Sequence, residues 1–276
     1  MRKYWAYYVS GLSEVGKILS IIKLSFIQDL EYRGDMLLYS LSYAAQPVVY
    51  LFVWLAITGS SKSVAMTAGE FAQYYIWLLV VQLWVSAWAS QEIAYAIRHG
   101  RISPHLLRPI PYLYVHLGAN LGSKVLKTLM TLPVVLILTM VLRPLWPQLS
   151  GFSWMIFAYT WLLAGVIYFL IDMCVGCLAF WIEETSAIDD LYNIIHSIFS
   201  GILIPLALMP PFVRNLATFL PFRYSLSFPM EILLGKLNGS EQLLGIFLQM
   251  AFAVVLYLTY NQLWKYGVKR YSAVGN

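Results

Sequence analysis

Few residues in this sequence are arranged for chemistry. Its only two cysteines, Cys174 and Cys177, form a CxxC pair inside an apolar block, with no second pair and no ligand cluster nearby. A CxxC pair indicates redox or metal chemistry in a soluble setting, whereas in this apolar block two small buried residues on one helix face is the better interpretation. The histidines do not have the spacing of a metal site: His99, His105, His116 and His196.

Motifs for nucleotide binding and hydrolysis are absent from the sequence. It contains no G-x-x-x-x-G-K-[ST] phosphate loop, no HExxH and no GxSxG. The stretch from Gly118 to Lys124 has the wrong spacing for a phosphate loop, but it holds GxxxG at Gly118 and Gly122, which is a helix-packing motif. We therefore expect no active site, no metal and no cofactor on this chain.

Two ionisable residues, Asp172 and His196, lie deepest in apolar blocks. Ionisable residues within membrane spans are functional candidates by default. A proton relay would need more of them on several helices, so we favour hydrogen bonding between helices for both. A solvated turn, or a gating or partner contact, would account for a separate acidic cluster: Glu183, Glu184, Asp189 and Asp190.

The elements that would position these residues are membrane spans. Of the 276 residues, 60% are hydrophobic and 11% are charged, whereas soluble domains are about half apolar and about a quarter charged. The apolar residues form blocks of about 20 residues, the length that crosses a bilayer. We expect an all-α membrane domain over residues 36–264 with six transmembrane helices: about 36–58, 71–91, 118–142, 151–177, 190–209 and 242–264.

Lysine and arginine residues predict the orientation of the spans. With the N-terminus inside, most of them lie in inner segments, and positive residues favour the cytoplasmic side. Both termini, including the tail 265–276, should then be cytoplasmic, in the inner (cytoplasmic) membrane of the cell. Lys124 and Lys127 would extend from the third span to the interface. The positive residues flank the spans and form no stripe, which argues against nucleic acid as a partner.

Two segments outside the spans have their own helical signals. Residues 1–35 precede the first span, and apolar residues recur there at steps of three and four from Val15 to Leu30. That spacing predicts an amphipathic helix on the inner membrane surface; the alternative is a cytoplasmic helix packed on a partner, and both can hold at once. Prolines interrupt residues 210–240, which are too apolar for an ordinary loop, so we expect two short re-entrant helices between spans five and six.

The loop between spans two and three is basic and contains a helix signal. Ser103 and Pro104 predict a helix start with serine as the cap, and Pro109 ends that helix soon afterwards. A short, rigid helix projecting into the cytoplasm would suit docking to another protein, although its arginines also fit inside-positive topology alone. The candidate docking residues are Arg98, Arg101, Ser103, Pro104, His105, Leu106, Leu107 and Arg108.

The chain from Cys174 to Leu237 resembles the permease subunits of type-2 ABC exporters. The resemblance is to the subfamily with an AFW segment after the fourth span, an SG-P-P run and an LPF-P-LG run. The loop from Gly100 to Pro109 is similar to that subfamily's "G.l...LLRP" loop. The matching residues are Ala179, Phe180 and Trp181; Ser200, Gly201, Pro205 and Pro210; and Leu220, Pro221, Phe222, Pro229, Leu234 and Gly235.

The resemblance implies a permease that pairs with a second permease, identical or related, and with two ATP-binding cassette ATPase subunits that hold ATP and magnesium. It implies a coupling helix on the ATPase around Ser103–Arg108 and a connecting helix at the N-terminus. The expected substrate is amphipathic or apolar: a lipid, a lipid-linked glycan, a peptide or a drug. The resemblance also makes five residues candidates for an outer gate: Pro205, Pro210, Pro221, Phe222 and Pro229.

Two alternatives stay open. An ion-coupled secondary carrier or channel would need no ATPase, but such folds usually show internal repeats, and none is clear between residues 36–142 and 151–264. The second alternative is a membrane scaffold or an immunity protein against a peptide toxin. An adjacent gene for an ATP-binding cassette would favour the exporter.

Overall fold

The computed structural model describes residues 14–60, 66–108, 110–141, 146–182 and 185–271, and the regular structure in these ranges is helical. The expected all-α class is thereby confirmed. Residues 1–13, Pro109, Glu183, Glu184 and residues 272–276 lie outside the described ranges. Among the described residues, three segments are long and apolar enough to cross a membrane: Ala68–Arg98, Gly151–Phe180 and Gly239–Arg270.

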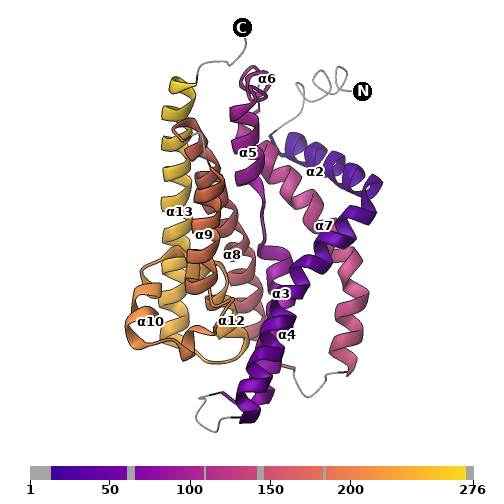
Figure 1. The fold of residues 1–276 in the computed structure, drawn as a ribbon, viewed down its shortest axis with the longest axis vertical. Helices are drawn as coiled ribbons and strands as arrows, with labels where there is room; N and C mark the ends of the chain where they lie inside the picture. Colours follow the sequence, from indigo (N-terminus) through magenta and orange to yellow (C-terminus); the bar gives the residue numbers. More distant parts are fainter. Residues whose placement is uncertain (1–13, 61–65, 109, 142–145, 183–184, 272–276) are drawn as a thin grey trace.

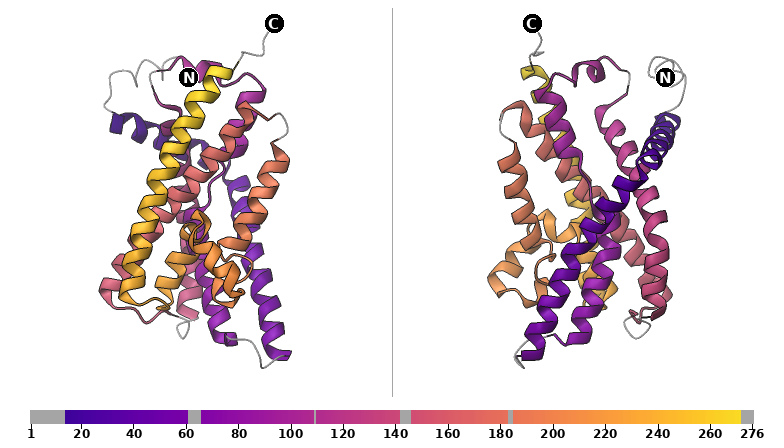
Figure 2. Two further views of the ribbon diagram at one scale, coloured as in Figure 1. Left: turned by 90° about the vertical axis from the view of Figure 1, so that its left-hand side faces the viewer. Right: turned by 45° about the vertical axis from the view of Figure 1, so that its right-hand side comes forward.

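The long helices run roughly along one axis, and α2 lies across them near one end (Figures 1 and 2). The same end carries α6 and the C-terminal end of α13, whereas the short helices α10–α12 lie toward the opposite end. The helices are α2 Glu14–Glu31, α3 Arg33–Ser60, α4 Ala68–Val85, α5 Ala89–Arg98, α6 Ser103–Leu106, α7 Tyr112–Val141, α8 Gly151–Cys177, α9 Ser186–Phe199, α10 Pro211–Thr218, α11 Pro221–Ser225, α12 Ser227–Leu233 and α13 Gly239–Arg270, with 3-10 turns η2 Leu178–Phe180 and η3 Leu206–Leu208.

The central helix is α8, which packs against α13, α5, α4, α11 and α12. Its bounds equal the predicted span 151–177, because Ser150 caps it by accepting a hydrogen bond from the amide of Ser153 at 3.2 Å and an uncharged run follows. A second group forms where α2 packs on α7, and α3 and α4 contact α7 beside it. The helix pair α4–α5 therefore lies between the α8–α13 group and the α2–α7 group.

The N-terminal helix α2 packs on α7 through the GxxxG sequence. A Cβ atom built on Gly118 would lie 2.6 Å from Ile21 Cγ2, and one on Gly122 would lie 2.7 Å from the carbonyl oxygen of Ile22. The hydroxyl of Ser25 donates a hydrogen bond to the carbonyl of Ala119 at 3.1 Å. The glycines thus permit close contact between the two backbones, while the opposite face of α2 leaves apolar side chains such as Leu19 exposed.

The segment predicted as the second span is broken. Helix α4 ends at Val85 and α5 begins at Ala89, so the interruption falls inside the predicted range 71–91. No proline or glycine lies there. Helix α8 contacts the chain closely at the break: a Cβ atom on Gly176 of α8 would lie 2.9 Å from Ser90 Cα.

The segment predicted as the fifth span, 190–209, is helical only as far as Phe199. Its 14 residues make a helix about 21 Å long at 1.5 Å per residue, which is shorter than a bilayer core of about 30 Å. Gly201 then takes φ +86° and turns the chain. Side chains of α4 satisfy the following carbonyls, since Tyr74 donates to Gly201 at 2.8 Å and Tyr75 donates to Leu203 at 3.0 Å.

Three short helices follow where two were predicted. They are α10, α11 and α12, and α11 and α12 pack against α8. Helix α13 then runs to Arg270, beyond the predicted end at residue 264, and Asn238 and Glu241 form a capping box at its start.

Candidate functional site

Helix α6 is a single turn whose N-terminal end is buried in the protein. Gly100, at φ +68°, turns the chain after α5, and Ile102 is fully buried. Ile102 occupies the cap position, so the prediction of Ser103 as the cap is wrong. The hydroxyl of Ser103 instead lies 3.0 Å from the hydroxyl of Tyr271, which ties α6 to the end of α13.

The tip of α6 is small, apolar and flanked by basic residues. Leu107 is 88% exposed, and Leu106, Pro104 and Arg108 are exposed as well. His105 turns inward, with its ring 5.4 Å from that of Tyr112 in an edge-to-face contact.

The two predicted arginines on the α5 side also lie near this tip. Arg101 lies over the ring of Tyr95 at 5.0 Å from its centroid, and Arg98 Nε donates to the carbonyl of Ala94 at 3.4 Å. The structure thus brings the predicted docking residues together at one end of the molecule.

Asp172 connects α8 to the break between α4 and α5. It is 3% exposed, and its Oδ2 accepts a hydrogen bond from the backbone amide of Ser90 at 3.1 Å. That amide belongs to the first turn of α5, where Trp88 provides no side-chain cap. The carboxylate therefore caps α5 from a neighbouring helix.

His196 connects α9 to α11. Its Nε2 lies 3.0 Å from the hydroxyl of Ser225, and that hydroxyl donates to the carbonyl of Phe222 at 2.7 Å, so Nε2 is the donor to Ser225. The imidazole also packs edge-on against Tyr168 at 4.8 Å and against Phe222 at 6.0 Å. The histidine thereby contacts an outer-gate candidate that the sequence did not associate with it.

A cavity of about 680 Å³ brings both intramembrane candidates together. Asp172 and His196 line it, together with Lys127, Asp29 and Glu92. These residues come from α8, α9, α7, α2 and α5, and their convergence was not visible in the sequence. The cavity lies between the α2–α7 pair and the helices α5, α8 and α9.

Two lysines of α7, Lys124 and Lys127, are buried beside the α4–α5 break and do not reach the membrane surface. Lys124 is 3% and Lys127 4% exposed, so the expectation that they extend to the membrane surface is wrong. Lys127 Nζ lies 4.2 Å from the ring centroid of Trp88, and Lys124 Nζ lies 5.4 Å from that of Trp84. Indole faces attract ammonium groups, and both indoles belong to the region of the α4–α5 break.

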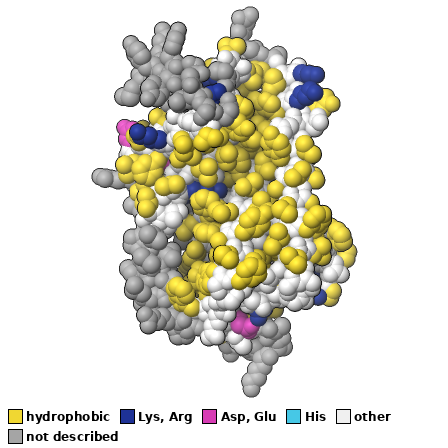
Figure 3. All heavy atoms as spheres, turned by 180° about the vertical axis from the view of Figure 1, so that it is seen from behind, with side chains coloured by type: hydrophobic (Ala, Val, Ile, Leu, Met, Phe, Trp, Pro, Cys, Tyr) yellow, Lys and Arg dark blue, Asp and Glu magenta, His cyan; other side chains and the backbone are white. Residues whose placement is uncertain are grey.

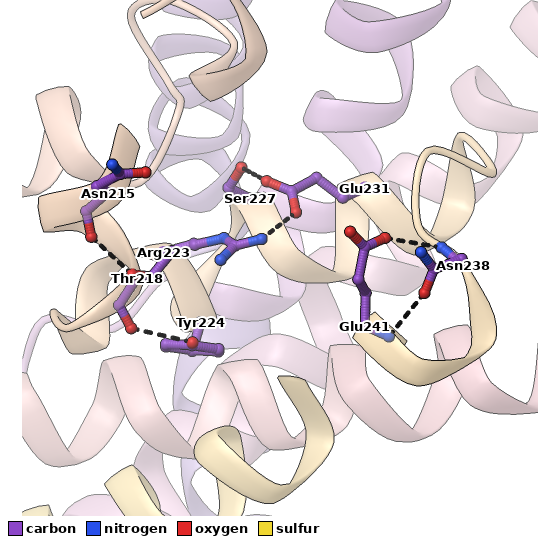
Figure 4. Close-up of polar contacts among 8 residues, drawn as sticks. All are labelled: Asn215, Thr218, Arg223, Tyr224, Ser227, Glu231, Asn238 and Glu241. Carbon is purple, nitrogen blue, oxygen red and sulfur yellow. Dashed lines mark hydrogen bonds and ion pairs between the residues drawn. The ribbon is translucent and has the colours of Figure 1, made fainter. Parts of the chain in front are cut away.

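The α10–α12 segment, toward the end of the molecule opposite α6, carries outer-gate candidates. It also holds a polar network, which Figure 4 shows. Arg223 pairs with Glu231 at 2.7 Å, and Ser227 donates to the other oxygen of Glu231 at 2.9 Å. Burial disfavours the charge of Arg223, but the attraction of Glu231 outweighs it and raises the pKa of the guanidinium above its usual value. The ion pair thus joins α11 to α12.

The candidate prolines mark the ends of the short helical pieces. Pro205 precedes η3, Pro210 precedes α10 and Pro221 is the first residue of α11, whereas Pro229 is buried within α12. Proline is favoured at such positions because its missing N–H would have no partner there.

A buried amide that the sequence did not point to lies in the first half of α13. Gln249 is fully buried, and its Nε2 donates to the carbonyls of Thr160 at 2.9 Å and Tyr224 at 3.0 Å. It therefore bonds α13 to both α8 and α11. A glutamine inside the apolar run from Leu243 to Leu258 is the signal that could have identified it.

Hydrophobic side chains cover much of the described part of one face, and few charged groups interrupt them there (Figure 3). Exposed apolar residues are also frequent on α8 and α13, for example Phe152, Met155, Phe247 and Val254. Such a surface is expected where lipid replaces water.

Comparison with known proteins agrees with these features. No curated protein matches the chain. A family model described as "ABC-2 family transporter protein" matches residues 44–275, from within α3 to beyond the end of α13. Members of this family are multi-pass membrane components that work with ATP-binding cassette ATPases. The match covers most of the chain, which therefore belongs to the ABC-2 transporter family as the membrane permease of an ABC transporter.

Proposed function

We propose that this permease exports an amphipathic or apolar substrate when a separate ATPase subunit binds and hydrolyses ATP. The observation that carries the proposal is the exposed tip of α6, where Leu107 projects between basic residues at the end of the bundle. A small apolar knob with positive flanks suits a hydrophobic pocket with acidic surroundings on a partner. The absence of a phosphate loop from the sequence agrees with an ATPase on another chain.

Helix α6 is held so that movement at its tip would reach several helices. Ile102 anchors it at α5, Ser103 bonds to Tyr271 at the end of α13, and His105 packs on Tyr112 at the start of α7. We propose that this coupling helix carries the ATPase movement into the bundle, with α2 as the connecting helix beside it. The α4–α5 break would let α5 move relative to α4.

The outer end would then open the pathway. The polar contacts from His196 through Ser225 to Phe222 link the central cavity to the segment that carries the gate candidates. A second permease, identical or related, would complete the pathway, and the interface of this pair would be the two-state element that such coupling requires. The inner membrane, with both termini cytoplasmic, is the expected location.

The test is Leu107→Ala combined with Arg108→Ala, assayed with the cognate ATPase in proteoliposomes. We expect weaker co-purification of the ATPase and loss of most substrate-stimulated ATP hydrolysis. The control is Leu258→Ala, which truncates another exposed leucine, within α13 and outside both the α6 tip and the gate segment. Unchanged assembly and coupling in the double variant would refute the proposed role of α6.

An ion-coupled carrier is the second candidate, because the cavity gathers several ionisable side chains: Asp29, Glu92, Lys127, Asp172 and His196. It predicts substrate accumulation driven by an ion gradient in vesicles that lack any ATPase. The exporter predicts no accumulation in those vesicles and ATP-dependent transport when the ATPase is present.

A further inference from the structure

Five side-chain amides line the central cavity, beside four serine hydroxyls and two tyrosines. Five helices (α2, α3, α4, α5 and α9) each contribute one carboxamide to its wall: Gln28, Gln46, Gln82, Gln91 and Asn193. In a chain that is 60% hydrophobic, such convergence at one place needs a reason. The volume of about 680 Å³ lies within the range of ligand sites, roughly 300–1,000 Å³.

The helix break forms part of the same wall. Ala87 and Trp88 in the break and Ser90 in the first turn of α5 line the cavity. Irregular backbone within a membrane domain is tolerated where protein buries it or where it borders a water-accessible cavity. Interrupted membrane helices are also a frequent mark of substrate sites in transporters. The break therefore indicates a binding site independently of the amides.

The charged groups of the cavity already have partners within the protein. Asp172 accepts the amide of Ser90 at 3.1 Å, Glu92 lies 3.4 Å from His116 Nδ1, and Asp29 accepts the hydroxyl of Ser123. The ammonium of Lys127 lies over Trp88. These contacts partly satisfy the charges within the protein, and a neutral ligand would leave them intact.

The amides offer further polar groups suited to a ligand, although Gln46 Nε2 already donates to Tyr50 at 3.1 Å. Gln82 Oε1 is buried, and no described residue donates a hydrogen bond to it. A carboxamide both donates and accepts hydrogen bonds, and so does a hydroxyl group. Aromatic rings of Tyr168 and Tyr192 also line the cavity and offer flat faces.

We infer that this cavity binds an uncharged, hydroxyl-rich headgroup, such as a sugar, belonging to the transported amphiphile. The inference rests on the proposed transport function and adds the chemical class of the substrate. The headgroup would contact the amides from five helices, and its apolar part would remain with the lipid-facing surface. An occupant of this site would touch the α4–α5 break directly.

Equilibrium binding to the full-length chain tests this inference. The protein is extracted with a styrene–maleic acid copolymer, so that no sugar detergent competes, and is titrated with octyl glucoside below its micellar concentration. Octyltrimethylammonium and octyl sulfate carry the same chain on a cation and an anion. We expect saturable binding of octyl glucoside, at least tenfold tighter than that of either charged probe.

Gln46→Leu and Gln82→Leu should each weaken octyl glucoside binding roughly three- to tenfold, as expected for one lost hydrogen bond. Gln262→Leu makes the same change at an exposed position on α13 that does not line the cavity, and it should bind like the wild type. Comparing the three probes on wild-type protein requires no variant to fold.

Equal or tighter binding of a charged probe, no saturable binding of the glucoside, or equal loss in Gln262→Leu would overturn the inference. Because no ATPase is present in this assay, its failure is distinct from failure of the proposed function. Glucoside binding without ATP-dependent transport would refute the transport proposal and leave the site in place.

Discussion

Asp172 reaches from α8 to the first turn of α5, where it accepts the amide of Ser90. The amides at a helix start have no partner within their own helix, and water is scarce within a membrane domain. The carboxylate replaces the cap that Trp88 does not provide. The buried charge is therefore explained first by helix–helix hydrogen bonding.

Replacing Asp172 should separate the role of the acceptor from that of the charge. Asp172→Ala leaves the Ser90 amide without its acceptor, so we expect the free energy of unfolding to fall by about 1–3 kcal/mol. Asp172→Asn keeps a side-chain oxygen at the same place and should lose less. Denaturant titration of the purified protein measures both values. Equal stability of Asp172→Ala and wild type would show that the cap contributes nothing.

Single residues show what the sequence could and could not predict. Asp172 and His196 were recognisable because an ionisable residue in an apolar run is costly and needs a partner. Their partners, Ser90 and Ser225, lie 82 and 29 positions away in the sequence, and no local pattern specifies such pairs. Lys124 was misplaced for the same reason, because its contact is the ring of Trp84 on another helix.

At the scale of helices, the GxxxG contact sets the position of α2. Gly122→Ala would place a methyl group 2.7 Å from the carbonyl oxygen of Ile22, so the two backbones must separate. We expect this variant to reduce disulfide formation between Ser25→Cys and Ala119→Cys at least several-fold in a background without native cysteines. Oxidation followed by gel electrophoresis after cleavage between the two helices measures the cross-link.

The matched control is Gly151→Ala, in the first turn of α8. A Cβ atom there has no neighbour within 4 Å, so cross-linking should equal that of the parent. If Gly122→Ala cross-links as efficiently as Gly151→Ala, close packing of α2 on α7 is not set by this glycine.

Helix ends were predictable where local chemistry determines them. Helix α8 has a serine cap and a run without charge from Gly151 to Ile171, and its predicted and observed bounds agree. Helix α9 is shorter than its apolar run, because Gly201 turns the chain and tyrosines from α4 accommodate the carbonyls that follow. The α4–α5 break likewise depends on Gly176 and Asp172 of α8. These ends depend on tertiary contacts and could not be read from local sequence.

At the scale of the whole molecule, α6 and the α10–α12 segment lie toward opposite ends (Figure 1). Leu107 and Asn215 are exposed at these two places. In a variant without Cys174 and Cys177, we expect a membrane-impermeant maleimide to label Asn215→Cys in intact cells. Leu107→Cys should react only after permeabilisation. The reverse pattern would place α6 outside and would contradict the cytoplasmic position proposed for it.

The contact between α2 and α7 also has a consequence for biosynthesis. Ser25 and Ala119 are 94 positions apart, and ribosomes add roughly 5–20 residues per second. The partner helix therefore emerges roughly 5–20 s after α2. During that interval the surface of α2 that later meets the glycines has no α7 to cover it. Until Gly118 and Gly122 have been synthesised, the nascent helix must remain at the membrane surface or bound to the insertion machinery.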